Sequence, residues 1–425
     1  MSRTLSEWLA WQEGLHLSSI DLGLDRISQV AARLQLQQLT MPIITVAGTN
    51  GKGSSVAMLD SIYRAAGYKT GCYTSPHLIR YNERIAIDGV PAVDQDICEA
   101  FAAIDAARGD ISLTYFEFGT LAAAYLFQKY QVAVAIFEVG LGGRLDAVNL
   151  WDADLALISN IDIDHIDWLG DDREQIGIEK SGIMRKGKTV VSGDANPTKT
   201  IASEAKRIGA NLLQQGKDFR FELSSDEETW LFLSTGQAPL SLPCPALQGR
   251  FQYYNASMVV AAVQSFQHTL PVSSEAIATG LKNVQVIGRL QKLGDCPELL
   301  VDVAHNAQSA AALADYLQQH PASGKTVAVF SALEDKDLHG ILAPLAKSFD
   351  AWYLLPLPGP RAQDPEKLLN KLQTIGVHGT LETQTEFSSV IKLLKNSLNC
   401  QDRVVAFGSF LIVSGFMQGL SVSDT

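Results

Sequence analysis

Cysteine is scarce in this 425-residue chain, which has only five. The count is odd, and no two cysteines have the CxxC spacing that thiol-redox and zinc sites use. We therefore expect no disulfide framework and no cysteine-type zinc site, and we expect a reducing compartment, the cytoplasm. The five are Cys72, Cys98, Cys244, Cys296 and Cys400.

Long apolar stretches and an excess of positive charge are also lacking. No run reaches the roughly 20 apolar residues of a membrane-spanning helix, and charges interrupt the N-terminal segment, so we expect neither a membrane span nor a signal peptide. The 34 Lys and Arg residues are outnumbered by 46 Asp and Glu, which gives a net charge of −12. This balance argues against a nucleic-acid partner, which needs a basic face. Backbone amides and a few placed cations can still bind anions.

Short apolar runs alternate with helical patterns along the first half of the chain. Such continuous strands, separated by helices, indicate a mostly parallel sheet covered on both faces, and hence an α/β fold. No signal for an interface between copies stands out, so we expect a monomer. The expected strands lie within residues 42–48, 69–75, 132–140, 153–161 and 188–193.

The pattern changes between residues 218 and 245, where polar turns interrupt short strand-like pieces. We interpret this region as a small β-rich insertion. The strand–helix alternation then resumes in a smaller α/β unit, so we predict a first domain at residues 1–287, a linker at 288–297 and a C-terminal domain at 298–425. The expected strands of the last domain lie within residues 298–306, 325–333, 350–357 and 402–410.

The segment GTNGKGS, from Gly48 to Ser54, lies between an expected strand and an expected helix. Glycines let backbone amides converge on phosphate oxygens, and Lys52 would reach the terminal phosphates. The strict P-loop pattern fails twice, because Val46 stands at its first glycine and Gly53 replaces the Ser or Thr that usually binds magnesium. We predict a P-loop ATPase-type domain, and an ordinary glycine-rich turn is the alternative.

The missing hydroxyl comes either from Ser54 or from another strand end. Ser75, just past an expected strand, is one candidate, although Ser75–Pro76 is also compatible with a plain turn. Glu138 ends the apolar run VAVAIF, and a buried carboxylate needs a cation or hydrogen bonds. Magnesium, which prefers oxygen ligands, is one such cation, and an ion pair with Arg144 is the alternative.

A histidine and a lysine follow. His165 lies among three aspartates in NIDIDHIDWLG, just past another expected strand, and is either a metal ligand or a structural hydrogen-bonding residue. Lys180 has apolar neighbours in sequence, and it is either a solvated helix lysine or a buried one. A buried Lys loses its charge readily and can then react.

Together these motifs resemble the bifunctional dihydrofolate synthase/folylpolyglutamate synthase family of the Mur ligase superfamily. The similarity runs over nearly the whole chain. The resemblance implies that ATP drives the addition of L-glutamate to dihydropteroate, through an acyl phosphate, and then to reduced folates to extend the glutamate tail. The motifs are IDLGLDRI, TVAGTNGKGS, TSPHLIRYNERI, GDISLTYFEFGTL, EVGLGGRLDAVN, DHIDWLG, EKSGI and DVAHN.

The resemblance also implies residue roles. It places ATP and pterin in the first domain and makes the last one the glutamate-ligase domain. It implies two Mg²⁺ sites, one bound by Ser75 and Glu138 and one by Glu138 and His165, with Lys180 as a carbamate. Lys52, Glu138, His165 and Lys180 are the expected catalytic residues. The expected nucleotide contacts are Thr49, Asn50, Gly51, Lys52, Gly53, Ser54, Asn255, Arg289 and Asp302. The expected substrate contacts are Asp21, Leu22, Gly23, Thr114, Tyr115, Phe116, Glu117, Leu145, Asp146, Ala147, His305 and Ser409.

Two departures from the family pattern concern the linker and the glutamate pocket, where the usual prolines are replaced by Ile287 and Ala307. Neither removes a chemical group. Two other functions are weighed against the folate ligase. A cell-wall Mur ligase would not need the pterin-type segments around Asp21 and Glu117. A P-loop protein that only hydrolyses or senses ATP would not need a second α/β domain.

Overall fold

A computed structural model of the chain describes residues 3–16, 18, 20–224, 228–359, 361–377, 380–383 and 386–423. The chain divides into two compact units. The first comprises residues 1–246 and 252–285, and the second comprises residues 247–251 and 286–425. Within the described part of the chain, no helix combines the length and apolar character that a membrane span requires. The predicted linker and the roles of the domains stay predictions.

The first unit is built on an eight-stranded sheet in the order β4-β3-β2-β5-β1-β6-β7-β8. The strands from β2 to β8 in this order run parallel, while β3 and β4 form an antiparallel edge. The mostly parallel α/β fold predicted from the apolar runs is therefore confirmed. The strands are β1 (Ile43–Ala47), β2 (Thr70–Tyr73), β3 (Ile85–Ile87), β4 (Val90–Pro91), β5 (Val134–Glu138), β6 (Leu155–Ile158), β7 (Thr189–Ser192) and β8 (Asn211–Gln214).

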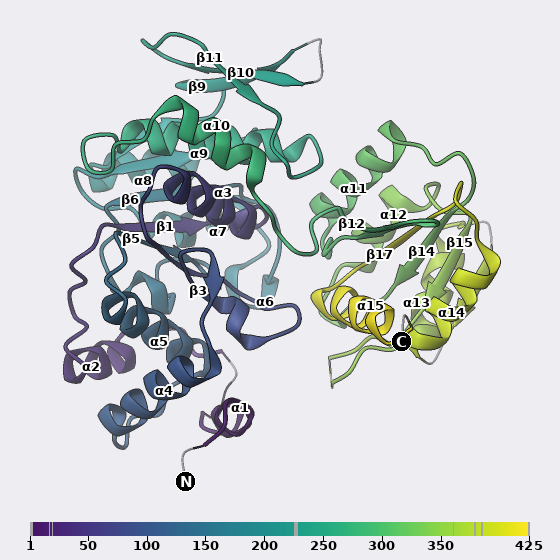
Figure 1. Cartoon of the computed structure of the whole chain (residues 1–425), viewed down its shortest axis with the longest axis horizontal. Coiled ribbons are helices and arrows are strands. Elements are labelled where there is room, and N and C mark those ends of the chain that lie inside the picture. Colours follow the sequence, from purple (N-terminus) through teal and green to yellow (C-terminus); the bar gives the residue numbers. More distant parts are fainter. Residues whose placement is uncertain are drawn as a thin grey trace. The chain divides into compact units, whose positions relative to one another are not determined.

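Helices cover this sheet because its central strands are apolar on both faces. Every residue of β1 and β5 is buried. Helix α3 packs on β1, β2 and β5 and contacts α10 on its other side, while α5 packs on β2 and contacts α4 (Figure 1). The helices are α1 (Leu5–Glu13), α2 (Asp25–Arg33), α3 (Lys52–Ala65), α4 (Asp94–Arg108), α5 (Tyr115–Lys129), α6 (Ile166–Leu169), α7 (Arg173–Ser181), α8 (Lys199–Ile208), α9 (Phe251–Ser265) and α10 (Ser274–Asn283).

The predicted β-rich insertion is a three-stranded antiparallel sheet of β9 (Phe219–Leu223), β10 (Thr229–Ser234) and β11 (Leu240–Pro243). Its β11 lies against α10. Trp230 of β10 is fully buried, with its ring 5.9 Å from that of Tyr253 in α9. This aromatic contact anchors the insertion to the helices of the first unit.

The second unit contains a six-stranded sheet in the order β12-β13-β17-β14-β15-β16, parallel except for β12. The four strands expected here are confirmed as β13, β14, β15 and β17. Within the range assigned to a linker, Gln291–Asp295 forms β12. The other elements are β13 (Glu298–Val301), β14 (Thr326–Phe330), β15 (Ala351–Leu354), β16 (Thr380–Thr383), β17 (Arg403–Phe407), α11 (Ala307–Gln319), α12 (Leu338–Leu345), α13 (Pro365–Thr374), α14 (Phe387–Ser397) and α15 (Phe410–Ser423).

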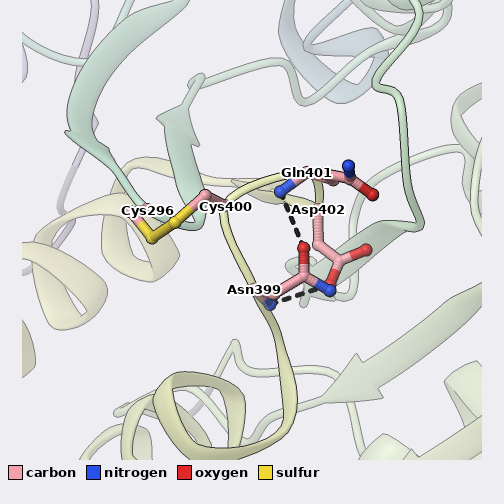
Figure 2. Close-up of a disulfide and its surroundings, with 5 residues drawn as sticks. All are labelled: Cys296, Asn399, Cys400, Gln401 and Asp402. Carbon is pink, nitrogen blue, oxygen red and sulfur yellow. Dashed lines mark hydrogen bonds between the residues drawn. A yellow bond between two sulfur atoms is a disulfide. The ribbon is translucent and has the colours of Figure 1, made fainter.

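We expected no disulfide framework, and the sequence analysis did not anticipate the one bond that Cys296 and Cys400 form (Figure 2). They are 104 residues apart in sequence, with Cα atoms 4.1 Å apart. Glu298 at the start of β13 pairs with Arg403 at the start of β17, so the residues just before the two strands are neighbours. A count of cysteines carries no information about this strand order, which is why the sequence did not predict the pair.

Breaking this disulfide should destabilise the second unit. A cross-link that closes a loop of this length restricts the unfolded chain, so the Cys296→Ser/Cys400→Ser variant should lose about 2–4 kcal/mol of unfolding free energy. Thermal unfolding with and without reductant measures the change. Cys98→Ser is the matched control, because Cys98 takes part in no disulfide. Equal unfolding temperatures for oxidised protein, reduced protein and double variant would contradict a stabilising bond.

Candidate active site

The strand order β2-β5-β1-β6 places the carboxyl ends of four parallel strands side by side. In this register Val46 lies opposite Glu138, and Tyr73 lies opposite Phe137. The phosphate loop after β1, Glu138 at the end of β5 and Ser75 just past β2 therefore share one edge of the sheet. Open α/β sheets bind their ligands at this edge.

The loop between β1 and α3 depends on two glycines. Gly48 has a φ of +148°, and a Cβ atom there would lie 1.8 Å from Ser159 Oγ. Gly51 has a φ of +84°, and a Cβ atom there would lie 2.5 Å from Asn255 Oδ1. Neither position accommodates a side chain without rearrangement. The structure thus brings Asn255 of α9 against the loop.

Lys52 and Ser54 begin α3 and differ in surroundings. The Lys52 ammonium donates hydrogen bonds to the carbonyl oxygens of Gly48 and Thr49, each at 3.0 Å, so it lies over the loop. Ser54 is buried, and its hydroxyl accepts a hydrogen bond from Gln252 Nε2 of α9 at 3.3 Å. This contact favours Ser75 over Ser54 as the replacement for the missing P-loop hydroxyl.

Glu138 is buried beside the phosphate loop. Its Oε2 accepts a hydrogen bond from the Ser75 backbone N–H at 3.2 Å, and a Cβ atom on Gly53 would lie 3.7 Å from the same oxygen. Arg144, the alternative partner, forms an ion pair with Glu179 at 2.9 Å. The structure thus brings Ser75 and Glu138 together, and their oxygens are of the type that magnesium prefers.

The chain after β6 runs along the phosphate loop and then reaches His165. The Thr49 hydroxyl donates to the Asp162 carbonyl oxygen and accepts from the Asp162 N–H, both at 3.0 Å. His165 follows with a φ of 53° and precedes α6. In the described ranges there is no cluster of three or more His, Cys, Asp or Glu side chains arranged to hold a metal. The set of Ser75, Glu138 and His165 has only two such residues, so it stays a prediction.

Lys180 is buried in α7, so the interpretation as a solvated lysine is wrong. Burial and the nearby Lys52 ammonium lower the pKa of Lys180 to about 7, although Asp164 and Asp146 act in the opposite direction. Asp146 is also buried, and this raises its pKa to about 6 against the hydrogen bonds that it accepts from backbone amides, including that of Leu141. The two lysines and Asp146 therefore belong to one electrostatic cluster.

Tight backbone packing holds the segments that carry these residues together. A Cβ atom on Gly143 would lie 2.8 Å from the Glu179 carbonyl oxygen, and one on Gly182 would lie 2.4 Å from the Arg144 Cα. The Arg144 N–H donates to the same Glu179 oxygen at 2.8 Å. The motifs GLGGR and EKSGI thus contain glycine where two backbones meet, which positions Lys180 near Asp146.

The residues expected to bind the pterin come together through an arginine. Arg26 forms ion pairs with Asp21 at 2.6 Å and with the buried Glu117 at 3.2 Å. Thr114 and Glu117 form the capping box that begins α5, and His16 contacts Asp21 at 3.1 Å.

The remaining pterin-side residues lie in the same region. The Phe116 ring lies against Gly140, where a Cβ atom would come within 2.7 Å of it. Tyr115 lies under the Arg84 guanidinium, 5.4 Å from its ring centre, and Ala147 follows Asp146 in a short 3-10 helix (Ala147–Leu150). Leu22 and Gly23 follow Asp21, and Leu145 precedes Asp146. The ligand contacts of all these residues stay predictions.

Four residues of the second unit were expected to contact nucleotide or glutamate, and they lie together within that unit. They are Arg289, Asp302, His305 and Ser409. Asp302 accepts hydrogen bonds from the Leu290 and Ala304 N–H groups, both at 2.8 Å, and burial raises its pKa against the effect of Arg289. Asp302 follows β13 and Ser409 follows β17, the neighbouring parallel strand. The rings of His305 and Phe410 are 6.0 Å apart, and the Arg289 guanidinium lies 5.3 Å from Phe410.

Comparison with known proteins gives two domain matches. The Mur ligase middle domain matches residues 46–263, and the Mur ligase glutamate ligase domain matches residues 288–410. The dihydrofolate synthase/folylpolyglutamate synthase of Escherichia coli K12 is 41% identical over 97% of this chain and 95% of its own length. The chain belongs to the dihydrofolate synthase/folylpolyglutamate synthase family.

Solved structures agree. Escherichia coli FolC in complex with DHPP and ADP is 40% identical, with a TM-score of 0.94 over 100% of this chain and 99% of its own. A bifunctional folylpolyglutamate synthase/dihydrofolate synthase with Mn, AMPPNP and L-glutamate bound is 40% identical. Its TM-score is 0.89, and the match covers 99% of this chain and 98% of the other. The resemblance expected from the sequence is thus confirmed. The alternative of a cell-wall Mur ligase is supported only at the level of the Mur ligase superfamily.

This folylpolyglutamate synthase family member also contains site-linked residues that sequence reasoning missed. Arg26 lies inside the IDLGLDRI motif, but nothing in its spacing indicated that it joins two carboxylates. Arg173 and Asp194 contact the segment before His165. No sequence signal marked them, because each depends on contacts between distant segments.

Proposed function

We propose that the chain joins L-glutamate to dihydropteroate, giving dihydrofolate, and to reduced folates, extending the glutamate tail, with ATP as the energy source. Membership of the family makes it an ATP-dependent ligase that forms carbon–nitrogen bonds. The observation that carries the residue assignment is the position of Glu138, whose buried carboxylate lies between Ser75 and Gly53 of the phosphate loop.

The chemistry proceeds in two steps. An oxygen of the substrate carboxylate attacks the γ-phosphorus of ATP, ADP leaves, and an acyl phosphate forms. The amine of glutamate then attacks the acyl carbon, phosphate leaves, and the amide remains after loss of a proton. The loop from Thr49 to Ser54 and the Lys52 ammonium would stabilise the transferred phosphoryl charge, since such transfer depends on positioning and charge neutralisation.

Residues at the end of β5, just past β2 and in the segment between β6 and α6 would bind the divalent metal. We propose that Ser75 and Glu138 hold one ion and that Glu138 and His165 hold a second. Metal bound there would offset the repulsion between the triphosphate and the attacking carboxylate. FolC-type structures bind AMPPNP together with Mn, which supports a divalent metal beside the nucleotide in this chain.

The pterin would bind along three segments, which are Asp21 to Gly23, Thr114 to Glu117 and Leu145 to Ala147. The roles proposed for Arg289 and Asp302 in nucleotide contacts, and for His305 and Ser409 in glutamate contacts, stay predictions. So do a monomeric state, a cytoplasmic location and the absence of a nucleic-acid partner, the last supported by the net charge of −12.

Product analysis tests the function directly. The protein is incubated with MgATP, dihydropteroate and L-glutamate, and the products are separated by chromatography and identified by mass spectrometry. We expect dihydrofolate, and phosphate release that requires both dihydropteroate and glutamate. Rapid phosphate release with ATP alone, and no amide product, would instead indicate an ATPase or ATP sensor.

Replacing Arg26 by methionine should affect folate use selectively. Without the guanidinium, buried Glu117 loses its cation and faces Asp21 with like charge. We expect KM for dihydropteroate to rise up to about 100-fold, because the groups around the substrate are misplaced, while KM for MgATP stays within about twofold. Arg33→Met is the matched control, since Arg33 lies in the same helix and bonds to the Ala107 carbonyl oxygen. An equal rise in both KM values would argue against a folate-side role.

Lys180 is proposed to carry a carbamate. Its neutral amine would attack CO₂ and lose a proton, and a pKa of about 7 makes that amine available near neutral pH. Lys180→Ala should lower activity about 10- to 100-fold, and wild-type activity should fall at pH values below 7 and after CO₂ depletion, because less carbamate forms. Carbon-13 NMR with labelled bicarbonate detects the adduct. Lys188→Ala, at an exposed lysine, is the control; a wild-type spectrum without a carbamate signal refutes the modification.

A further inference from the structure

The extended segment from Asn160 to Asp162 is held from two sides. On one side it binds the phosphate loop: the Asn160 carbonyl oxygen accepts from the Thr49 N–H at 2.9 Å, and Asn160 Oδ1 accepts from the Asn50 N–H at 2.8 Å. Asp162 contacts the Thr49 hydroxyl through both backbone groups. Ile161, between them, uses its own N–H and carbonyl oxygen on the other side, toward Asp194 and Arg173.

On that other side Arg173 and Asp194 close a ring around Ile161. The Ile161 N–H donates to Asp194 Oδ2 at 3.0 Å, and Arg173 Nε donates to the Ile161 carbonyl oxygen at 2.8 Å. The two side chains pair at 3.1 Å. Asp194 is buried, and its Oδ1 also accepts from the Asn196 N–H at 2.9 Å, while Arg173 donates to the Asn196 carbonyl oxygen at 2.8 Å.

We propose that Arg173 and Asp194 are positioning residues for nucleotide binding, which set the segment that holds Thr49 and Asn50 and leads to His165. Neither residue is placed at substrate. Both act through the backbone of Ile161, whose neighbours in sequence touch the phosphate loop. The inference rests on the proposed function in one respect, because the KM values can be measured only if the chain has the proposed ligase activity. The hydrogen-bonded ring itself does not depend on that function.

A bonded ring of this kind can position a segment more strictly than apolar packing. Hydrogen bonds that involve charged groups are short and directional. Removing Arg173 leaves the buried Asp194 without its cation. Removing Asp194 takes away the acceptor of the Ile161 N–H, and in either case the segment is held less firmly against the loop. Small errors in the position of reacting groups cost much activity. A purely structural pair would instead weaken the whole unit without preference for one substrate.

The experiment compares Asp194→Asn, Asp194→Ala, Arg173→Ala and Arg173→Lys with Arg207→Ala, which removes an exposed pair with Glu204 on α8. For each full-length variant, hydrogen exchange is followed in peptides that cover residues 156–170. KM is measured for MgATP and for dihydropteroate, and thermal unfolding is recorded. Asp194→Asn keeps an acceptor for the Ile161 N–H and remains informative where Asp194→Ala does not fold.

We expect faster exchange at residues 161–162 and a rise in KM for MgATP of up to about 100-fold in Asp194→Ala and Arg173→Ala. KM for dihydropteroate should stay within about twofold, Arg173→Lys should recover part of the loss, and Arg207→Ala should match wild type. Unchanged exchange, or equal rises in both KM values, would overturn the inference. If wild type makes no amide product, the proposed function fails separately, and exchange together with MgATP affinity still decides the positioning role.

Discussion

Replacing Lys52 by alanine should reduce both ligase activities by about a thousandfold or more while the fold stays intact. The ammonium lies over the phosphate loop, 3.0 Å from the carbonyl oxygens of Gly48 and Thr49. We propose that it neutralises charge that builds up as the γ-phosphoryl group is transferred, which a methyl group cannot do. The loss should therefore fall on kcat more than on the KM for dihydropteroate.

Replacing Lys52 by alanine should also change the pKa of Lys180. Lys52 helps to hold down the pKa of Lys180, so its removal should raise that pKa and leave less neutral Lys180 amine near pH 7. Lys52→Arg keeps the charge and should retain more activity than Lys52→Ala. Lys69→Ala is the matched control, because Lys69 is exposed and bonds to the Tyr130 carbonyl oxygen. Turnover near the wild-type rate in Lys52→Ala would refute the role.

Replacing Glu138 by glutamine should lower kcat about 100- to 1,000-fold and raise the magnesium concentration needed for half-maximal rate. Glutamine keeps the size of the side chain and an oxygen that can accept the Ser75 N–H, which the carboxylate accepts at 3.2 Å. Only the negative charge is lost. Because a cation bound beside the phosphate loop would depend on that charge, the effect should be larger on metal dependence than on stability.

Titration of activity with magnesium measures this change. Glu99→Gln is the matched control, since Glu99 is half exposed and pairs with Lys129 on the surface. Its magnesium titration should superimpose on that of wild type. If Glu138→Gln also has the wild-type magnesium dependence, Glu138 does not bind the metal, and the lost activity would have another cause.

The strands that were predicted best are the buried central strands, because each of them is a nearly continuous apolar run in the sequence. Residues 42–48 and 132–140 contain β1 and β5, where apolar side chains face both directions and helices cover both faces. The short strands β3 and β4 escaped prediction, because their edge position leaves them partly exposed and without a long apolar run.

The site shows the same contrast. Ser75 and Glu138 were singled out because one follows a strand and the other ends one, and the order of the parallel strands places them side by side. Whether Lys180 is solvated or buried could not be decided from its neighbours, since burial depends on the close approach of Gly143 to the Glu179 backbone. Arg26 and the Cys296–Cys400 bond depend on segments far apart in sequence, which no local pattern encodes.

Isotope transfer tests the central claim, that this phosphate loop activates a carboxylate by phosphorylating it. Dihydropteroate is labelled with oxygen-18 at both carboxyl oxygens and incubated with MgATP and L-glutamate. One labelled oxygen should leave in the released phosphate, and the other should remain in the amide of dihydrofolate. Dihydrofolate formed with unlabelled phosphate would contradict an acyl phosphate and, with it, the chemistry assigned to Lys52 and Glu138.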